Sequence, residues 1–291
     1  MNDKFRRLSL SYYVGKLFPR SLPPRLLIIF FAIIIQTGAE VLSWYAVSSR
    51  NPAIISLAVV LWLIWFGLIF LIAKPSTDKL LSPHRKILQI VVLFLIVILS
   101  FMAIGEGIGF HLVNTGVVTE NEMAEFLTES INYNDATALN HQASLLLLKG
   151  ENPYESTNII DAVEEFEVPT EYLTPLKQGA FADVFPYPTE EQVDEVLNDA
   201  KASGDVTPLE FESKVSYPAG SFIFQAPLVS LGLEDTRVFY LICAILMVAV
   251  IFWKSPKAFR PLVFLAFVTN LVFWNLIGTG TTDTLYVLFI L

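Results

Sequence analysis

The chain has 291 residues, of which 54% are apolar and only 16% are charged, and its mean hydropathy is +0.57. A soluble domain carries about a quarter charged residues, so this composition argues against an ordinary soluble protein. The single cysteine, Cys243, excludes an intrachain disulfide, and the net charge of −9 disfavours nucleic acid as a partner.

Apolar blocks of about twenty residues, the length of a helix that crosses a bilayer, recur along the chain. They predict about five complete transmembrane helices and the start of a sixth, at 26–47, 53–73, 87–105, 238–253, 261–277 and from 285 onward. Because the last block is too short to span, we expect the sequence to be the N-terminal part of a longer protein, with further site residues beyond Leu291. The predicted fold class is an all-α integral membrane protein.

Basic residues gather in three segments, 1–25, 74–86 and 254–260, which hold 13 of the 19 Lys and Arg residues. If each apolar block crosses once, these segments share one side of the membrane. Positive charge marks the cytoplasmic side, so we expect a cytoplasmic N-terminus. The basic leader precedes a block too long for a signal peptide, and no cleavage site follows it.

A long polar segment separates the third and fourth apolar blocks, and between positions 120 and 235 it holds 23 acids and four lysines. Apolar periodicity predicts helices at 120–132 and 134–148, the second closed by Lys149 and Gly150. A capping box at Thr189 predicts a helix to about 202. We therefore expect a folded, mostly helical loop on the extracytoplasmic side.

The segment 217–233 is apolar but is broken by Pro218 and Pro227. The two prolines argue against a full span, so we interpret it as an interfacial or re-entrant helix. The predicted organisation is a leader at 1–25, transmembrane helices at 26–117, the acidic loop at 118–216, this segment, and further transmembrane helices at 234–291.

Two motifs lie on the predicted outer side. The first opens with Asn134 and Asp135, continues as a helix, and ends in the turn Gly-Glu-Asn-Pro-Tyr at 150–154. The second begins with Tyr217 and Pro218. Together they resemble the motifs of the GT-C superfamily of membrane glycosyltransferases, in particular the mannosyltransferases that use polyprenyl-phosphate mannose. Ala219 stands where that family has a second proline.

The resemblance implies transfer of a hexose from a polyprenyl-phosphate donor to a lipid or glycan acceptor, with inversion, at the outer face of a prokaryotic plasma membrane. It gives Asp135 the role of the base that takes the proton of the acceptor hydroxyl. Polar groups near the same face would bind the substrate and its phosphate. The candidates for binding are Asn134, His141, Asn152, Tyr154, Lys214, Tyr217 and Arg237.

Each of these assignments has a structural alternative. Asp135 would serve well as a helix N-cap, and His141, about 120° further around the helix, would be a surface or packing residue. The turn at 150–154 stops a helix on structural grounds alone. Tyr217 would be an interfacial aromatic.

Three further acids are candidates for a second carboxylate or a ligand of a divalent cation. Glu40 lies inside the first predicted span, where a carboxylate is costly. Glu106 lies at the outer end of the third span, and Asp283 precedes the last block. The alternative for all three is a snorkelling or interfacial carboxylate. No cofactor is certain from the sequence.

Other chemistry has little support. Three histidines and one cysteine give no zinc pattern, and the sequence has no P-loop, no dinucleotide-binding glycine motif and no Gly-x-Ser-x-Gly elbow. The main rival to an enzyme is a transporter or an assembly subunit, with the acidic loop as a docking cap and Glu40 as a coupling residue.

Overall fold

A computed structural model describes residues 15–49, 51–114, 133–184, 187–278, 280 and 282–290, with the backbone alone at 47, 48 and 106–114. These residues contain helices and no strand, as predicted. They belong to two compact units: unit 1 is Met1–Thr119 with Val248–Trp274, and unit 2 is Glu120–Met247 with Asn275–Leu291. The helix predicted at 120–132 lies outside the described residues.

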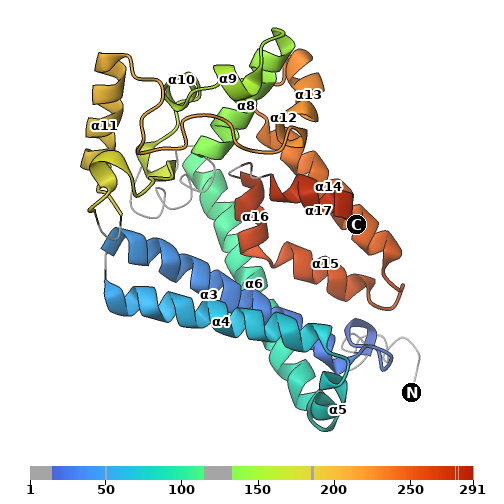
Figure 1. The fold of residues 1–291 in the computed structure, drawn as a ribbon. Helices are drawn as coiled ribbons and strands as arrows, with labels where there is room; N and C mark the ends of the chain where they lie inside the picture. The colour runs from blue at the N-terminus through green and yellow to red at the C-terminus, as the bar shows by residue number, and fades with distance from the viewer. Residues whose placement is uncertain are drawn as a thin grey trace. The chain divides into compact units, whose positions relative to one another are not determined.

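Unit 1 is built from long apolar helices joined by short turns (Figure 1). Its elements are η1 (Pro24–Leu27), α3 (Ile28–Ser49), α4 (Pro52–Ala73), α5 (Thr77–Leu81), η2 (Ser82–His84), α6 (Arg85–Asn114), the last turns of α14 (Arg237–Lys254), α15 (Arg260–Val268) and the start of α16 (Leu271–Gly278).

Helices α3 and α4 lie side by side as a pair, and Figure 1 shows them running together over their length. Small side chains allow the close approach: Ala39 and Ala58 are almost fully buried, and Gly38 faces Leu61. The Nε1 atom of Trp62 donates a 3.1 Å hydrogen bond to the Ser43 hydroxyl across the pair.

Within the described residues, four helical segments are long and apolar enough to cross a membrane, and a bent pair adds a fifth if it is one span. The segments are Pro24–Ala46, Pro52–Ala73, Thr77–Gly105 and Arg237–Lys254, and the bent pair is α15 with α16. α4 exposes large apolar side chains such as Phe66 and Phe70, as a lipid-facing helix does. The chain is therefore a multi-pass helical membrane protein.

The predicted fifth span, 261–277, is not one straight helix, because α15 and α16 meet at an angle of 57°. The Thr269 hydroxyl donates to the Leu265 carbonyl at 2.7 Å. The Asn270 side chain accepts the backbone N–H of Phe273 at 3.1 Å and so starts a new helix. The Trp274 ring N–H satisfies the Phe267 carbonyl at the break.

The three basic segments meet at one end of unit 1. Phe18 and Leu22 of the leader, Leu88 of α6 and Phe259 and Leu262 near the start of α15 belong to a single apolar cluster. This cluster joins the leader to both basic connections, and that their charges share one side of the membrane stays a prediction. Which side of the membrane this end faces stays a prediction.

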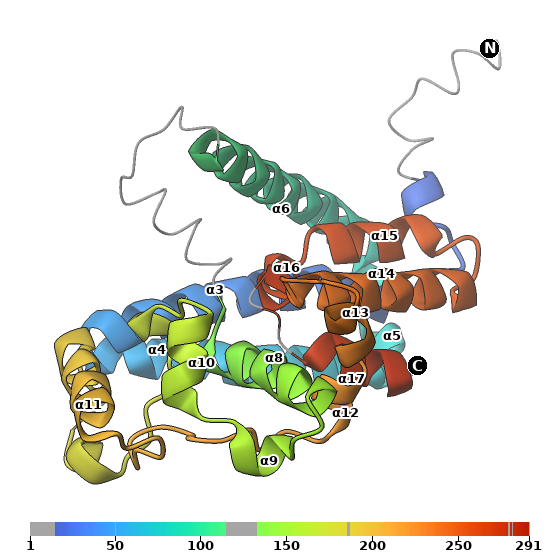
Figure 2. The same cartoon turned by 90° about the horizontal axis from the view of Figure 1, so that it is seen from above.

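Unit 2 is a set of shorter helices around α8 (Asp135–Leu148), and Figure 2 shows α8 flanked by α10 and α12. Its other elements are α9 (Pro153–Ser156), α10 (Ile159–Glu165), η3 (Thr170–Tyr172), η4 (Gly179–Phe181), α11 (Glu190–Ser203), α12 (Gly220–Ile223), α13 (Ala226–Ser230), the first turns of α14, and α17 (Asp283–Ile290). Its core includes Leu139, Ile159, Phe181 and Phe222.

The sequence signals in unit 2 produce the predicted helix ends. α8 ends at Leu148 with Lys149 as its C-cap, and Gly150 follows with a φ of +81° and an N–H bond to the Leu147 carbonyl, which together form a glycine cap. Thr189 and Gln192 form the predicted capping box of α11, and Gly204, with a φ of +73°, closes it.

The segment 217–233 forms two short helices, α12 and α13, rather than one. Pro227 lies in the first turn of α13, where its missing N–H costs nothing. Ile223, Phe224 and Leu231 are exposed. The placement of this segment at the membrane surface stays a prediction.

Candidate functional site

The first turn of α8 begins with two polar residues, Asn134 and Asp135, which have different roles. Asn134 is the N-cap, and its side-chain oxygen accepts the Thr137 N–H at 2.8 Å. Asp135 follows as the first helical residue. The alternative that Asp135 is the N-cap was therefore wrong by one position. The Asp135 carboxylate is left to accept other hydrogen bonds.

Asp135 is buried, with 9% of its surface exposed. One carboxylate oxygen accepts the Ala136 N–H at 2.7 Å, and the other accepts the Thr174 N–H at 2.7 Å. Burial raises the pKa of Asp135; the bonds from Thr174 and Ala136 oppose this, and nearby Glu212 reinforces it. Asp135 thus ties the loop after η3 to α8 and is also the kind of buried carboxylate that suits a general base.

α8 holds the second motif through polar side chains that the sequence analysis did not single out. The Ser221 hydroxyl donates to the Asn140 side-chain oxygen, and the Gln225 amide donates to the Asn140 carbonyl at 2.8 Å. The Ser144 hydroxyl donates to the Phe222 carbonyl at 3.0 Å. Asn140 and Ser144 are polar and lie one helical turn apart, so the helical period places them on one face of α8, and this spacing was the available signal.

The two motifs also touch directly. The Tyr154 hydroxyl donates to the Tyr217 carbonyl at 2.9 Å, and the Tyr154 ring packs edge-on against Phe222. Asn152 caps α9 through the Tyr154 N–H. The structure thus brings Tyr154 and Tyr217 together and gives Asn152 a local structural role.

Burial and nearby carboxylates raise the pKa of Tyr217. Burial raises the pKa of its hydroxyl, and the carboxylates of Asp135, Glu212 and Asp283 add to the effect. The predicted base Asp135 and the predicted second acid Asp283 are therefore each within electrostatic range of Tyr217 of the second motif in unit 2. This gathering of acids favours a protonated or neutral group beside Tyr217 over an anion.

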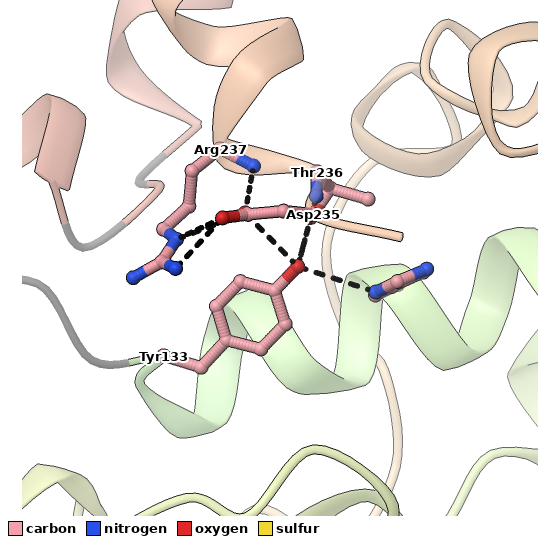
Figure 3. Close-up of polar contacts among 5 residues, drawn as sticks. Tyr133, Asp235, Thr236 and Arg237 are labelled. Atoms are coloured by element: carbon pink, nitrogen blue, oxygen red, sulfur yellow. Dashed lines mark hydrogen bonds and ion pairs between the residues drawn. The ribbon is translucent and has the colours of Figure 1, made fainter. Parts of the chain in front are cut away.

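A second polar group centres on Tyr133, which precedes α8 (Figure 3). The Thr236 N–H donates to the Tyr133 hydroxyl oxygen at 2.8 Å, and the Asp235 carboxylate lies 3.4 Å from the same atom. Arg237 lies over the Tyr133 ring at 5.1 Å from its centroid. This group joins the start of α8 to the start of α14, which are about a hundred residues apart in the sequence.

Arg237 is bound by its neighbour Asp235. Its Nε atom donates at 2.9 Å and its Nη2 atom at 2.7 Å to that carboxylate. Burial alone would raise the pKa of Asp235, but the hydrogen bonds and charge of Arg237 hold it below its usual value. Only Nη1 of Arg237 lacks a hydrogen bond to the part of the chain that the structure describes, so this side chain offers a substrate one free edge.

His141 is buried rather than on the surface, with 4% of its area exposed. Its ring stacks on Phe166 at 4.4 Å between centroids, and Nδ1 lies 3.3 Å from the Tyr133 hydroxyl. Burial lowers the pKa of His141 to about 4, against a smaller opposing effect of Asp235. The packing alternative describes this contact set, and the neutral ring is unsuited to hold an anion at neutral pH.

We expect unit 2 to lose stability as the pH falls from 6.5 to 4. The unfolded chain binds a proton at His141 near pH 6.5, whereas the folded chain binds it only near pH 4. This difference removes up to about 3 kcal/mol across that window. His141→Gln should flatten the dependence of the melting temperature on pH, while His84→Gln on the exposed η2 should not. Equal slopes for the two variants would contradict the assignment.

The remaining predicted site residues lie in other settings. The Lys214 ammonium donates to the Glu155 carbonyl at 2.5 Å, and the residue is half-buried. Glu40 lies in α3 of unit 1. Glu106 lies in α6, and its side chain is outside the described residues. Glu40 and Glu106 thus belong to unit 1, whereas the group around Asp135 belongs to unit 2, and the hydrogen bond of Lys214 goes to a backbone carbonyl.

No three His, Cys, Asp or Glu side chains among the described residues are placed to hold a metal ion. No protein-family model, no curated protein and no solved structure matches this chain.

Proposed function

We propose that the chain is a membrane glycosyltransferase that moves a hexose from a polyprenyl-phosphate donor to an acceptor hydroxyl at the outer face of a prokaryotic plasma membrane. The single observation that carries this proposal is the gathering of the two motifs in unit 2. The Tyr154 hydroxyl binds the Tyr217 carbonyl, and Tyr217 lies within electrostatic range of both Asp135 and Asp283.

The chemistry assigned to Asp135 is that of a general base. Its carboxylate accepts the proton of the acceptor hydroxyl as the acceptor oxygen bonds to the anomeric carbon. The bond from that carbon to the phosphate oxygen breaks at the same time, and polyprenyl phosphate leaves with the electron pair. A single displacement of this kind inverts the anomeric centre. The raised pKa of Asp135 makes it a stronger base than an exposed carboxylate.

The departing phosphate needs positive charge or N–H donors. Arg237 supports this role because its Nη1 edge is unengaged in the described part of the chain, although Asp235 neutralises much of its charge. Lys214 is a second candidate. The acids around Tyr217 repel an anion, so we place the acceptor hydroxyl there and the phosphate nearer Arg237.

An assembly or scaffold subunit is the second candidate function. The observation that favours it is that the motif residues make structural contacts. Asp135 accepts hydrogen bonds from two backbone N–H groups, Asn152 caps α9, and Arg237 is ion-paired with Asp235. Such a protein would keep these contacts with no catalytic turnover.

The experiment is a transfer assay with the full-length protein in nanodiscs. Labelled polyprenyl-phosphate hexose and the corresponding nucleotide hexose are supplied in parallel with lipid and glycan acceptors, and release of polyprenyl phosphate is measured. We expect release and sugar transfer with the lipid-linked donor alone. Transfer from the nucleotide sugar, or no release from the lipid-linked donor, would contradict the proposal.

A further inference from the structure

The end of unit 1 where the three basic segments meet has a strong charge imbalance. The described residues of these segments include ten Lys and Arg residues but only one acidic residue, Asp78. We call this region the basic end. Its members are Lys16, Arg20, Arg25, Lys74, Lys79, Arg85, Lys86, Lys254, Lys257 and Arg260.

Three arginines of the basic end are used to hold the segments together. Arg25 pairs with Asp78 through its guanidinium, and its backbone N–H also donates to that carboxylate at 3.0 Å. Arg85 donates to the carbonyls of Pro19 and Arg20 at 2.7 and 3.0 Å. Arg260 donates to the Trp253 carbonyl at 3.2 Å. These bonds fix the leader, the start of α6 and the turn after α14.

Four lysines of the basic end, unlike these arginines, do not hold the segments together. Lys74, Lys79, Lys86 and Lys257 are exposed, and none of their ammonium groups has a hydrogen bond or ion pair with the part of the chain that the structure describes. Because the single acid is already paired with Arg25, the charge of these lysines is not neutralised within the described residues. An outside anion is the partner that such a surface fits.

Large apolar side chains stand beside these lysines at the surface. Leu80 is 70% exposed, Ile87 is 64% exposed, and Trp253 is 73% exposed. They directly follow Lys79 and Lys86 and directly precede Lys254 in the chain. A surface that alternates lysine with exposed Leu, Ile and Trp matches the boundary between lipid tails and headgroups. Its position at the ends of α4, α6 and α14, all candidate spans, agrees with that boundary.

We propose that the basic end binds the phosphate headgroup of an anionic phospholipid, with the acyl chains against the exposed apolar side chains. Lys79, Lys86 and Lys257 supply the charge, and the arginine bonds keep them in fixed places. The proposal is independent of the glycosyltransferase proposal, because it concerns unit 1 alone. It commits to a lipid rather than free phosphate because only a lipid also covers Leu80, Ile87 and Trp253.

The test is a lipid titration of the detergent-solubilised full chain, followed by native mass spectrometry. Phosphatidylglycerol is the anionic probe and phosphatidylcholine is the zwitterionic reference. We expect the wild type to bind phosphatidylglycerol more tightly, and less so at high salt. The triple variant Lys79→Gln, Lys86→Gln, Lys257→Gln should weaken that binding about fivefold per lysine, or about a hundredfold in all, and leave phosphatidylcholine binding unchanged.

A matched control removes three exposed lysines of unit 2, Lys149, Lys177 and Lys201, by the same change to Gln. It should bind phosphatidylglycerol as the wild type does. An equal loss in both triple variants would overturn the proposal, because total charge alone would then explain it. Unchanged binding in the unit 1 variant, or displacement of the lipid by millimolar inorganic phosphate, would also overturn it. Replacement of the same three unit 1 lysines by Arg should retain binding.

Discussion

Asp135→Asn is expected to lower kcat for sugar transfer by about 10² to 10⁴-fold, the usual contribution of a general base, with little change in KM. In the wild type, activity should fall as the pH is lowered and Asp135 becomes protonated. This loss should occur above the ordinary aspartate pKa of 3.8, because burial raises the pKa of Asp135. The asparagine variant should lose this acidic limb of the pH–rate profile. Steady-state kinetics over pH 4 to 8 measure both effects.

Asp135 also binds backbone N–H groups, so its replacement needs controls that separate catalysis from folding. An asparagine NH₂ would face one of two N–H donors, which costs about 1–3 kcal/mol. Thr174→Ala removes the side-chain bond from Thr174 to Asp135 and keeps the carboxylate, and Asp194→Asn removes an exposed acid of α11. Asp194→Asn should retain the pH–rate profile. Thr174→Ala should retain activity at neutral pH but move the acidic limb to higher pH, because it removes a bond that lowers the pKa of Asp135. If Thr174→Ala lost as much activity as Asp135→Asn, the base assignment would be wrong.

Gly280→Ala is expected to destabilise unit 2 strongly. Gly280 has a φ of +75°, which a side chain disfavours. An added Cβ would lie 2.9 Å from Thr137 Cγ2 and 3.0 Å from Arg237 Cγ. Strain and overpacking together should cost about 2–4 kcal/mol, which lowers the melting temperature by about 5–15 °C.

Gly204→Ala is the matched control, because Gly204 has nearly the same φ, +73°, and nothing within 4 Å of an added Cβ. Gly204→Ala introduces the same conformational strain without the close contacts, so it should lower the free energy of unfolding by about 1 kcal/mol. Differential scanning fluorimetry of the two variants compares them directly. Equal shifts would contradict the close packing of the turn at 280 against α8 and Arg237.

The membrane helices were predictable because their signal is local. A block of apolar residues as long as the bilayer is thick predicts a helix whatever it packs against, and the blocks at 26–47, 53–73, 87–105 and 238–253 coincide with candidate spans. The break between α15 and α16 was missed because average hydropathy hides it. Thr269 and Asn270, adjacent in an apolar block, were the local signal for the bend.

The candidate site was less predictable because its contacts join distant parts of the chain. The bond from Tyr133 to Thr236 spans 103 positions, and that from Asn140 to Ser221 spans 81. No spacing rule connects such residues in a single sequence. The motif resemblance singled out Tyr154 and Tyr217, which do touch, but only the folded chain shows that Asn134 rather than Asp135 is the N-cap.

The measurement that tests the central proposal most directly is the anomeric configuration of the transferred sugar. Product made by the full-length protein from a polyprenyl-phosphate hexose of known configuration is analysed by the one-bond C–H coupling at its anomeric carbon in an NMR spectrum. A single displacement with Asp135 as the base predicts a product with the opposite configuration to the donor. A product of retained configuration, or no transferred sugar, would contradict it.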